Sequence, residues 1–530
     1  MYKVLISDFI SEAGLEILEN EVDVHLKTGL NRDDFLDVIG EYDGIIVRSS
    51  TQLDKEAIDR ANNLKVIGRA GVGYDNIDVE EASKKGIIVF NTPTGNTISA
   101  AEHAIAMMLA LSRNIPQAHG DLFKGLWNRK KYKGTEVKDK TLGIVGFGRI
   151  GNHVSKCAHG LGMNVIIHDP YISTDKAEKL NISLVEFDEI LSSSDYISLH
   201  VPLTDETEYM LDKDEFAKMK DGVRIINVAR GKNIRNESLI TALKSGKVAG
   251  AAIDVYEKEP IDENNPLLEL KDKVVLTCHL GATTAEAMDN VAVSAAEQVL
   301  TVLRGGLPES PLNIYSIDSK QLDKAKPYLK LVNKLGNFIA QWKEHERIED
   351  ITVEYGGIIA EHNSKPYTTT LLKDILDPVL DYKVNLVNAY LIAKERGIKI
   401  KESHITTPES LNNIIKIIVK TNKGTHSIAG TLLPVGYRVV EINNFRIDLN
   451  LEGTFLVASY HDKPGIIGKV GTILGDDEVN IASMQVGRDD QIGEAIMIIQ
   501  TDSKPSKKIM EKIKGELDFL DIAYVKVNGD

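Results

Sequence analysis

The sequence predicts a multidomain α/β protein, and three observations support this prediction. Strand-like and helix-like segments alternate from the first residues, a glycine-rich turn lies between two strands near residue 146, and residues 453–530 follow the order β-α-β-β-α-β. Alternating strands and helices are typical of parallel sheets covered by helices. A chain of 530 residues is long enough for about three or four domains.

The first part of the chain is expected to form a parallel α/β sheet of its own. The expected elements are strands at residues 4–7, 44–48, 65–69 and 87–90 and helices at 11–19 and 55–61. A mostly apolar helix at 99–112 would join this sheet to the next domain. The cleft between two such domains is where a small ligand would bind.

A glycine-rich turn, KTLGIVGFGRIG, occupies residues 140–151. An apolar strand runs into Gly146, Gly148 and Gly151, and a helical pattern follows. The first glycine allows the tight turn, the second lets the backbone approach a pyrophosphate, and the third lets helix and strand pack closely. The pyrophosphate then lies at the positive end of the helix. A tight turn without chemical use is the alternative, but strand, helix and a following acid together favour a bound dinucleotide.

That acid, Asp169, follows the strand at 164–168 and selects the cofactor. A carboxylate there can accept hydrogen bonds from the ribose hydroxyls and would repel a 2′-phosphate. The next four residues include no arginine or lysine to neutralise such a phosphate. NAD is therefore favoured over NADP, the alternative being a solvated turn aspartate.

Composition excludes several classes of protein. A net charge of −15 argues against a nucleic-acid partner or an anionic membrane surface. The two cysteines, Cys157 and Cys278, lie far apart in sequence, and we expect a reduced, cytoplasmic protein without a secretory leader. The sequence contains no uninterrupted apolar run of about eighteen residues, so we expect no membrane span.

Three chemically useful side chains follow successive strands of the second domain. Strands at 223–228, 249–254 and 274–277 lead to Arg230, to Glu259 and to His279, respectively. Ligands of open parallel sheets bind at this edge. An arginine can hold a carboxylate and polarise a carbonyl, and a histidine oriented by a glutamate can carry a proton. Taken singly, the three could be a surface ion pair, a solvated turn residue and a loop histidine, but together they suit the interconversion of 2-hydroxy and 2-oxo acids.

These motifs resemble the D-isomer-specific 2-hydroxyacid dehydrogenases, and among them the long enzymes that act on 3-phosphoglycerate. The similarity covers residues 1–312 and 453–530 and is weaker between them. It rests on the sequences NVAR and HLGA, on GRAGVGYDNID at 68–78 and on NTPTGNTISAAEH at 91–103. The resemblance implies that Arg230, Glu259 and His279 form the catalytic set, that NAD is the cofactor, and that no metal takes part.

The resemblance also implies which residues bind the cofactor and the substrate. The cofactor positions are Gly146, Gly148, Arg149, Ile150, Gly151, Asp169, His200, Val201, Pro202, Val228, Ala229, Arg230, Asp254, His279, Gly281 and Ala282. The substrate positions are Arg48, Ser49, Gly71, Val72, Asn96 and Arg129. Because phosphoglycerate carries both a carboxylate and a phosphate, its pocket needs more than one cation, and Arg48, Arg129 or Lys130 could supply them, although basic loop residues are usually solvated.

The C-terminal region reads as a separate regulatory module. Its expected elements are strands at 454–460, 480–486, 495–501 and 522–527 and helices at 463–474 and 507–514. This order is ferredoxin-like, and with DKPGIIGKVGTIL and VNIASMQVGR it resembles an ACT domain. In related enzymes L-serine binds where two such modules pair, which implies effector positions at Tyr460, Asp462 and Asn480. Alternatively, Asp462 caps the following helix and Asn480 begins a strand.

The expected fold is a Rossmann-type NAD domain inserted in a flavodoxin-like substrate domain, followed by an α/β intervening domain and a ferredoxin-like ACT domain. The expected ranges are 1–96 and 284–312 for the substrate domain, 97–283 for the NAD domain, 313–452 for the intervening domain and 453–530 for the ACT domain. Within the intervening domain, strands and helices alternate, including segments 367–372, 385–396 and 412–421, and residues 425–434 resemble part of that domain in long relatives. No group of residues there identifies a ligand.

The expected function is oxidation of 3-phospho-D-glycerate to 3-phosphooxypyruvate with NAD, the first step of L-serine biosynthesis, with feedback control by L-serine. We expect a homodimer or homotetramer. The alternatives are a dehydrogenase for glycerate, glyoxylate or D-lactate, or a dinucleotide-sensing binding protein. A formate-type enzyme fits less well, because such enzymes lack a carboxylate at the position of Glu259. The C-terminal module and the lack of a basic or peptide-docking segment favour the enzyme.

Overall fold

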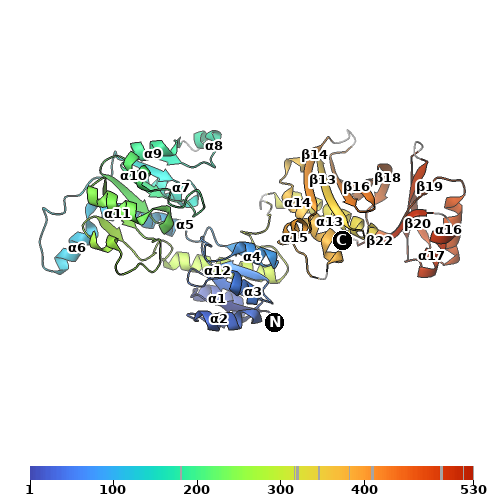
Figure 1. Cartoon of the computed structure of the whole chain (residues 1–530), viewed down its shortest axis with the longest axis horizontal. Coiled ribbons are helices and arrows are strands. Elements are labelled where there is room, and N and C mark those ends of the chain that lie inside the picture. Colours follow the sequence, from blue (N-terminus) through green and yellow to red (C-terminus); the bar gives the residue numbers. More distant parts are fainter. Residues whose placement is uncertain are drawn as a thin grey trace. The chain divides into compact units, whose positions relative to one another are not determined.

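The computed structural model describes residues 1–179, 182–315, 317, 321–343, 346–380, 382–406, 411–489, 493–516 and 519–528. The chain forms two compact units, one made of Met1–Asp78 with Phe90–Ser310 and the other of Val79–Val89 with Pro311–Asp530. Figure 1 shows the elements of each unit along the chain. None of the helices among the described residues combines the length and the apolar character that crossing a membrane requires.

The first sheet has five strands in the order β2-β1-β3-β4-β5, and β1 to β4 run parallel. This is the flavodoxin-like strand order. Its strands are β1 (Lys3–Ile6), β2 (Asp23–Leu26), β3 (Gly44–Val47), β4 (Val66–Arg69) and β5 (Ile88–Asn91). The helices between them are α1 (Glu12–Glu19), α2 (Arg32–Val38), η1 (Ile39–Glu41), α3 (Lys55–Arg60) and α4 (Val79–Lys84).

Helix α12 (Ala285–Leu303) returns the chain to this sheet after the second domain. The fit is close: a Cβ atom on Gly14 of α1 would lie 2.8 Å from the Cβ of Ala292. On β4, a Cβ on Gly68 would lie 3.1 Å from Val299. Helix α12 therefore completes the first domain, and the second domain is inserted before it.

The second sheet has seven strands in the order β12-β11-β10-β9-β6-β7-β8, and their pairings are parallel. The strands are β6 (Thr141–Val145), β7 (Asn164–His168), β8 (Ser183–Leu184), β9 (Tyr196–Leu199), β10 (Val223–Asn227), β11 (Val248–Ile253) and β12 (Val274–Leu276). The helices are α5 (Thr97–Arg113), α6 (Ile115–Phe123), α7 (Arg149–Gly160), α8 (Thr174–Lys179), α9 (Phe187–Ser193), α10 (Lys213–Lys218), η2 (Gly231–Asn233), α11 (Asn236–Ser245) and η3 (Pro266–Glu269). The strand order reverses between β6 and β9, as in a doubly wound Rossmann sheet, and ligands bind at such a reversal. The predicted fold class is confirmed.

The apolar runs of these strands are explained by burial on both faces. All four residues of β9 are buried. Along β6, Leu142 and Ile144 pack with Met107 of α5 on one face, whereas Val145 packs with residues of α9 and α11 on the other. Parallel strands that helices cover on both sides need such continuous apolar sequence.

The second unit contains a six-stranded mixed sheet in the order β14-β13-β15-β16-β17-β18. Only the pair of β13 with β14 is parallel; the remaining four pairs are antiparallel. Its strands are β13 (Ile348–Gly357), β14 (Lys399–Ile405), β15 (Asn413–Thr421), β16 (Gly424–Leu433), β17 (Gly436–Ile442) and β18 (Phe445–Asn450). The helices are α13 (Leu322–Trp342), η4 (Ile358–Glu361), α14 (Lys365–Leu376), η5 (Asp377–Val379) and α15 (Ala389–Glu395). Residues 367–372 lie in α14, and 412–421 nearly coincide with β15.

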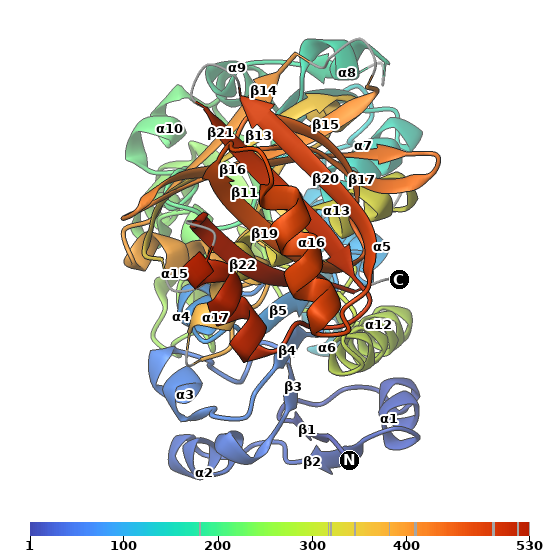
Figure 2. The same ribbon diagram turned by 90° about the vertical axis from the view of Figure 1, so that its right-hand side faces the viewer.

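The C-terminal sheet has the order β20-β21-β19-β22 and is antiparallel. Its elements are β19 (Gly453–His461), α16 (Ile466–Asp476), β20 (Ile481–Asp489), β21 (Glu494–Thr501), α17 (Lys507–Glu516) and β22 (Phe519–Val527). Figure 2 shows α16 and α17 in red, side by side on one face of this sheet. The predicted ferredoxin-like arrangement is therefore present.

The two sheets of the second unit share one apolar core. On β19, Leu456 and Ala458 face α16 and α17, whereas Phe455 and Val457 belong to the core that contains α13. The rings of Phe455 and Phe338 of α13 lie 6.2 Å apart. At the edge of the sheet, Gln341 Nε2 donates to the carbonyl of Lys526 at 2.9 Å and Gln341 Oε1 accepts from its N–H at 3.0 Å. Helix α13 thus covers the sheet face that α16 and α17 leave open.

Replacing Phe455 with alanine should destabilise both sheets of the second unit together. Loss of a buried phenylalanine costs about 3–5 kcal/mol because a cavity remains. Hydrogen exchange should accelerate in α13 as well as in β19, whereas Ser459→Ala on the same strand should leave both unchanged. Faster exchange confined to β19 and its helices would contradict a shared core.

Candidate active site

The candidate active site lies where β10, β11 and β12 end. These strands are neighbours in the parallel sheet, so their carboxyl ends meet at one edge. Arg230 follows β10, Asp254 follows β11 and His279 follows β12. The sheet thus gathers residues that are up to 49 positions apart in sequence.

His279 and Glu259 form a hydrogen-bonded pair. The distance between His279 Nδ1 and Glu259 Oε2 is 2.7 Å, and both side chains are partly exposed. The other oxygen of Glu259 accepts from the N–H of Tyr256 at 3.0 Å. Burial alone would raise the pKa of Glu259, but the hydrogen bonds from His279 and from Tyr256 lower it. A carboxylate that holds Nδ1 leaves the far side of the imidazole available for proton transfer.

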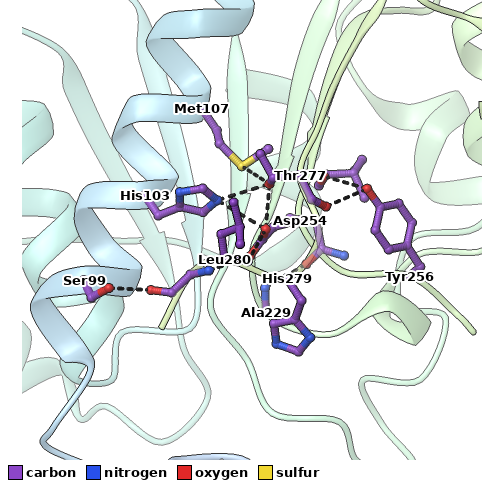
Figure 3. A network of polar contacts seen from close by, with 12 residues as sticks. Ser99, His103, Met107, Ala229, Asp254, Tyr256, Thr277, His279 and Leu280 are labelled. Carbon is purple, nitrogen blue, oxygen red and sulfur yellow. Dashed lines mark hydrogen bonds and ion pairs between the residues drawn. The ribbon is translucent and has the colours of Figure 1, made fainter. Parts of the chain in front are cut away.

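The buried carboxylate of Asp254 organises the loop that carries His279 (Figure 3). Asp254 is fully buried. Its Oδ1 accepts from the N–H of Leu280 at 2.8 Å and from Thr277 Oγ1 at 2.6 Å, and its Oδ2 accepts from the N–H of Gly281 at 2.9 Å. His279 itself has a left-handed backbone with φ of 59°, a conformation that side chains rarely adopt unless their surroundings impose it.

A second histidine, His103 on α5, completes this network. Its Nε2 lies 3.3 Å from Asp254 Oδ1 and 3.2 Å from Thr277 Oγ1. Burial by itself would raise the pKa of Asp254, but hydrogen bonds from His103, Thr277 and the two backbone N–H groups outweigh it and lower this pKa to about 2. Ser99, also on α5, donates to the carbonyl of Gly281 at 2.8 Å. Helix α5 therefore helps to hold the His279 loop in place.

Two further arginines, Arg48 and Arg230, lie near Arg69. Arg69 ends β4, and its Nε is buried with no hydrogen-bond partner among the described residues. Burial, then the charges of Arg230 and Arg48, lower the pKa of Arg69 to about 10. Arg230 is held by Asp75, with Nε 2.8 Å from Oδ2. Two cations near a half-buried guanidinium whose Nε has no partner among the described residues indicate a candidate anion site.

Two glycines make room for these guanidinium groups. A Cβ atom on Gly73 would lie 1.5 Å from a terminal nitrogen of Arg230, and one on Gly71 would lie 2.2 Å from a terminal nitrogen of Arg69. Gly71 also has a φ of 145°. The loop at residues 71–75 therefore approaches the arginines as closely as backbone can.

The loop that begins at Arg48 is fixed by Asp8 at the end of β1. Asp8 Oδ2 accepts from the N–H of Arg48 at 2.6 Å and from that of Thr51 at 3.2 Å. Asn76 donates to the carbonyls of Arg48 and Thr51 at 2.8 and 2.6 Å. Ser49, between these anchors, is exposed. Val72 accepts from Asn91 Nδ2 at 2.6 Å.

The glycine-rich turn has the shape that a dinucleotide needs. Gly146 has a φ of 91°, and a Cβ on it would lie 2.6 Å from the carbonyl oxygen of His200. A Cβ on Gly151 would lie 2.1 Å from the carbonyl oxygen of Gly146, whereas one on Gly148, the N-cap of α7, would meet nothing within 4 Å. The open space at Gly148 in front of a twelve-residue helix fits a pyrophosphate.

Asp169 supports this turn from the end of β7. Its Oδ2 accepts from the N–H of Phe147 at 2.8 Å and its Oδ1 from that of Tyr171 at 2.9 Å. Each carboxylate oxygen can accept a further hydrogen bond. The carboxylate therefore fits the ribose of a dinucleotide without giving up its structural bonds.

The other predicted cofactor positions line the same carboxyl edge. His200, Val201 and Pro202 follow β9, Val228 and Ala229 follow β10, and Gly281 and Ala282 follow β12. Arg149 and Ile150 begin α7. Burial lowers the pKa of His200 to about 4, so its ring is neutral, and Ser198 Oγ lies 2.9 Å from Nε2. Asn96 is the N-cap of α5, and its buried Oδ1 has no hydrogen-bond partner among the described residues.

One set of predicted residues is not brought together within one chain. Arg129, a predicted substrate position, is exposed after α6, and it is the effector positions that lie apart. At the C-terminal module, Asp462 directly follows His461, which pairs with Glu494 at the start of β21. Asn480 directly precedes Ile481, which pairs with Thr501 at the end of β21. At roughly 3.3 Å per residue the two ends of β21 are about 20 Å apart. Asp462 pairs instead with Arg488, with Nε 2.7 Å from Oδ2, and Asn480 donates to Asp502 at 2.8 Å.

Several residues of the site were missed by sequence reasoning. Arg69, Gly73 and Asp75 lie in the motif GRAGVGYDNID, and His103 ends the motif NTPTGNTISAAEH. Both motifs indicated this region of the chain. The basic side chain within the first motif is the signal that could have identified Arg69 as a residue of the candidate site. The pairing of His103 with Asp254, which are 151 positions apart, carried no sequence signal.

Comparison with known proteins agrees with this arrangement. Residues 105–281 match the NAD binding domain of the D-isomer specific 2-hydroxyacid dehydrogenases, 324–443 the D-3-phosphoglycerate dehydrogenase intervening domain, and 454–518 the ACT domain. A D-3-phosphoglycerate dehydrogenase of Archaeoglobus fulgidus is 41% identical over 99% of this chain and 100% of its own length. The chain belongs to the D-3-phosphoglycerate dehydrogenase family.

Other relatives extend this result. A D-3-phosphoglycerate dehydrogenase of Synechocystis is 42% identical over 99% of this chain and 95% of its own length. The crystal structure of the TT0316 protein from Thermus thermophilus superposes with a TM-score of 0.55 and 32% identity over 58% of this chain and 99% of that one. The resemblance predicted from the motifs is confirmed, including the intervening domain that the sequence matched only weakly.

The role of Asp254 predicts an acid dependence of stability. Its pKa is about 2 in the folded protein, against an ordinary value of 3.8. A carboxylate with a lowered folded pKa stabilises the fold above its unfolded pKa, and this contribution is lost as the pH falls through the folded pKa. The stability difference between wild type and Asp254→Asn should therefore be constant above about pH 5 and shrink from about pH 4 towards pH 2.

Denaturant unfolding at a series of pH values would measure this difference. Asp289→Asn, at an exposed position of α12, is the matched control and should change stability little. A difference that persists unchanged to the lowest pH would mean that the Asp254 carboxylate is not the stabilising group.

Proposed function

We propose that this chain oxidises 3-phospho-D-glycerate to 3-phosphooxypyruvate with NAD, the reaction that opens L-serine biosynthesis. The observation that carries the proposal is the presence of Arg48 and Arg230 near the guanidinium of Arg69, together with the His279–Glu259 pair at the same sheet edge from which Arg230 emerges. A substrate with both a carboxylate and a phosphate satisfies three cations better than a simple 2-hydroxy acid does. The full-length similarity to D-3-phosphoglycerate dehydrogenases supports the same substrate.

The electrostatics of Arg69 support an anionic substrate. With a pKa of about 10, its guanidinium remains charged at neutral pH although it is half-buried near two like charges. A bound anion would relieve this repulsion and supply the partner that Nε lacks among the described residues. We propose that Arg230 contacts the substrate carboxylate and the oxygen at C2 that becomes the carbonyl oxygen. Arg230 follows β10 and His279 follows β12, and both strands end at the same edge of the sheet.

In the proposed reaction, the C2 hydroxyl gives its proton to His279, the C2–H bond breaks, and the carbonyl forms. NAD, when bound, accepts the hydride from C2. Glu259 holds Nδ1 of the imidazole at 2.7 Å, which orients the ring and stabilises the imidazolium that results. Arg230 stabilises negative charge on the C2 oxygen as the proton leaves. Asp254 fixes the loop that positions His279 against the substrate.

NAD is the cofactor. The open backbone at Gly148 and the start of α7 would hold its pyrophosphate, and Asp169 would accept from its ribose hydroxyls. The same carboxylate would repel the 2′-phosphate of NADP. The two cysteines, Cys157 and Cys278, are free thiols, which supports a cytoplasmic location, where thiols stay reduced.

We further propose that the enzyme is a homodimer or homotetramer. Helix α6 has no buried residue, and the segment around it exposes a cluster of large apolar side chains. They are Ile115, Leu122, Phe123, Leu126 and Trp127, with Phe123 and Trp127 each 81% exposed. An apolar cluster of this kind is typical of a surface that a second subunit covers.

Paired C-terminal modules would form the effector site for L-serine. Among the described strands, β20 has a hydrogen-bonded neighbour on one side only, β21. A two-fold axis that paired β20 with its copy in antiparallel fashion would bring Asn480 of one subunit towards Tyr460 and Asp462 of the other. Asp462 would then meet the serine ammonium and Asn480 its polar groups. This explains why the two positions lie apart within one chain.

A steady-state assay tests the dehydrogenase directly. The purified protein should reduce NAD with 3-phospho-D-glycerate at a kcat/KM at least tenfold above that with D-glycerate or D-lactate, because only the first substrate uses all three arginines. His279→Gln should lower kcat roughly a hundredfold or more, as expected for loss of a general acid/base, while NAD binding stays intact. Equal rates with the unphosphorylated acids, or an unimpaired His279→Gln variant, would refute this assignment.

Asp462→Asn should weaken L-serine binding roughly tenfold or more, because a charge-assisted hydrogen bond to the ammonium is lost. Calorimetry on the intact protein measures the binding, and the rate without serine should not change. Asp476→Asn, at an exposed position of α16, is the control. If both variants bind serine as the wild type does, Asp462 is not the ammonium ligand.

A further inference from the structure

The division between the two compact units runs through a strand of the substrate domain. Strand β5 (Ile88–Asn91) begins in the second unit, which contains Val79–Val89, and ends in the first, which resumes at Phe90. Its residues Val89 and Phe90 are fully buried. One continuous segment of backbone therefore belongs to the second unit, which contains the C-terminal regulatory module, at its start and to the first unit, which contains the candidate active site, at its end.

At its start, this segment is held by two asparagines of the regulatory unit. Asn313 Oδ1 accepts from the N–H of Val89 at 2.9 Å, and its Nδ2 donates to the carbonyl of Ile87 at 2.8 Å. Asn385, just before α15, donates from Nδ2 to the carbonyl of Gly86 at 2.7 Å. A Cβ atom on Gly86 would also lie 2.7 Å from this Nδ2. The turn at Gly86 is thus clamped closely.

At its end, the segment holds the loop beneath the arginines. Asn91 Nδ2 donates to the carbonyl of Val72 at 2.6 Å. Thr92, which is fully buried, accepts from the N–H of Gly71 at 2.7 Å and donates its own N–H to the carbonyl of Gly71 at 3.0 Å. Gly71 in turn leaves room for the guanidinium of Arg69. A shift of β5 along its length would therefore move the backbone on which the anion site is built.

We propose that Asn385 and Asn313 are positioning residues of the substrate site. They hold the start of β5, and β5 places Asn91 and Thr92, which set the loop at Gly71 and Val72 against the arginines. A movement of the regulatory unit would reach the substrate through this strand as a change in affinity for the anionic substrate. The inference rests on the proposed function, because the affinity concerned is that of the three-arginine site.

The hydrogen bond from Asn385 to Gly86 can be removed without removing the bonds that the Asn385 side chain accepts. Its Oδ1 caps the turn before α15 by accepting from the N–H groups of Val387 and Asn388 at 2.9 and 3.2 Å, and only its Nδ2 reaches Gly86. Asn385→Asp keeps the acceptor and replaces the donor with an oxygen that faces the carbonyl of Gly86. Asn313→Asp likewise keeps the bond from Val89 and loses the donations to Ile87 and to Ser83 Oγ.

Steady-state kinetics of the full-length enzyme test the proposal. Asn385→Asp should raise KM for 3-phospho-D-glycerate about three- to tenfold, with kcat and KM for NAD unchanged, because the loop shifts while the His279 pair does not. L-serine should still bind by calorimetry but alter the rate less than in the wild type. Hydrogen exchange of a peptide covering residues 70–75 should accelerate, since the bond from Gly71 to Thr92 weakens.

Asn337→Asp is the matched control. Asn337 is half-buried on α13 and also donates from Nδ2 to one carbonyl, that of Asn333 at 2.8 Å, but it does not touch β5 or its turn. If Asn385→Asp does not fold, Asn313→Asp answers the same question. If the wild type is active on 3-phospho-D-glycerate and either Asn385→Asp or Asn313→Asp equals Asn337→Asp in KM and in hydrogen exchange, the inference is overturned. If the wild type is inactive on 3-phospho-D-glycerate, the proposed function is overturned instead.

Discussion

The catalytic edge depends on one buried carboxylate, that of Asp254. Two backbone N–H groups, a hydroxyl and the imidazole of His103 surround it. A buried charge is costly unless such donors compensate it, and once they do, they are held in place themselves. Because these donors belong to the loop after β12 and to α5, the carboxylate fixes the left-handed backbone of His279 relative to the sheet. Without this constraint the pairing of His279 with Glu259 would have no fixed position relative to the turn at Gly148.

The candidate anion site follows a different principle, because its cations are only partly compensated by Asp75 and Asp8. Arg69 is half-buried near Arg48 and Arg230, and the desolvation of its guanidinium together with these two charges lowers its pKa. Such a cluster is unfavourable until a ligand with more than one negative charge enters, so binding selects for that ligand. Asp75 holds Arg230 in the meantime, which keeps its guanidinium oriented. The candidate site therefore draws on both domains of the first unit. The inserted domain supplies Arg230 and His279, and the substrate domain supplies Arg48 and Arg69.

The second unit is continuous with the first through the backbone of β5. Its two sheets share a core around α13, so the C-terminal module cannot move independently of the six-stranded sheet without exposing Phe455 and Phe338. The same unit holds the turn at Gly86 through Asn385. In the coupling that we propose, an effector at the C-terminal sheet acts on substrate affinity through β5.

The sequence by itself determined the α/β class, the dinucleotide turn, the strand ends that carry Arg230, Glu259 and His279, and the βαββαβ module. These features are set by local periodicity and by glycine spacing within some thirty residues, which a linear chain displays directly. Only the tertiary structure decided that Arg69 joins Arg48 and Arg230, that His103 meets Asp254, that Asn480 lies far from Asp462 in one chain, and that Asn385 reaches Gly86. Each of these is a contact or a separation between residues distant in sequence. Such relations depend on which elements pack against one another, and the local periodicity of an element shows its buried face but not its partner.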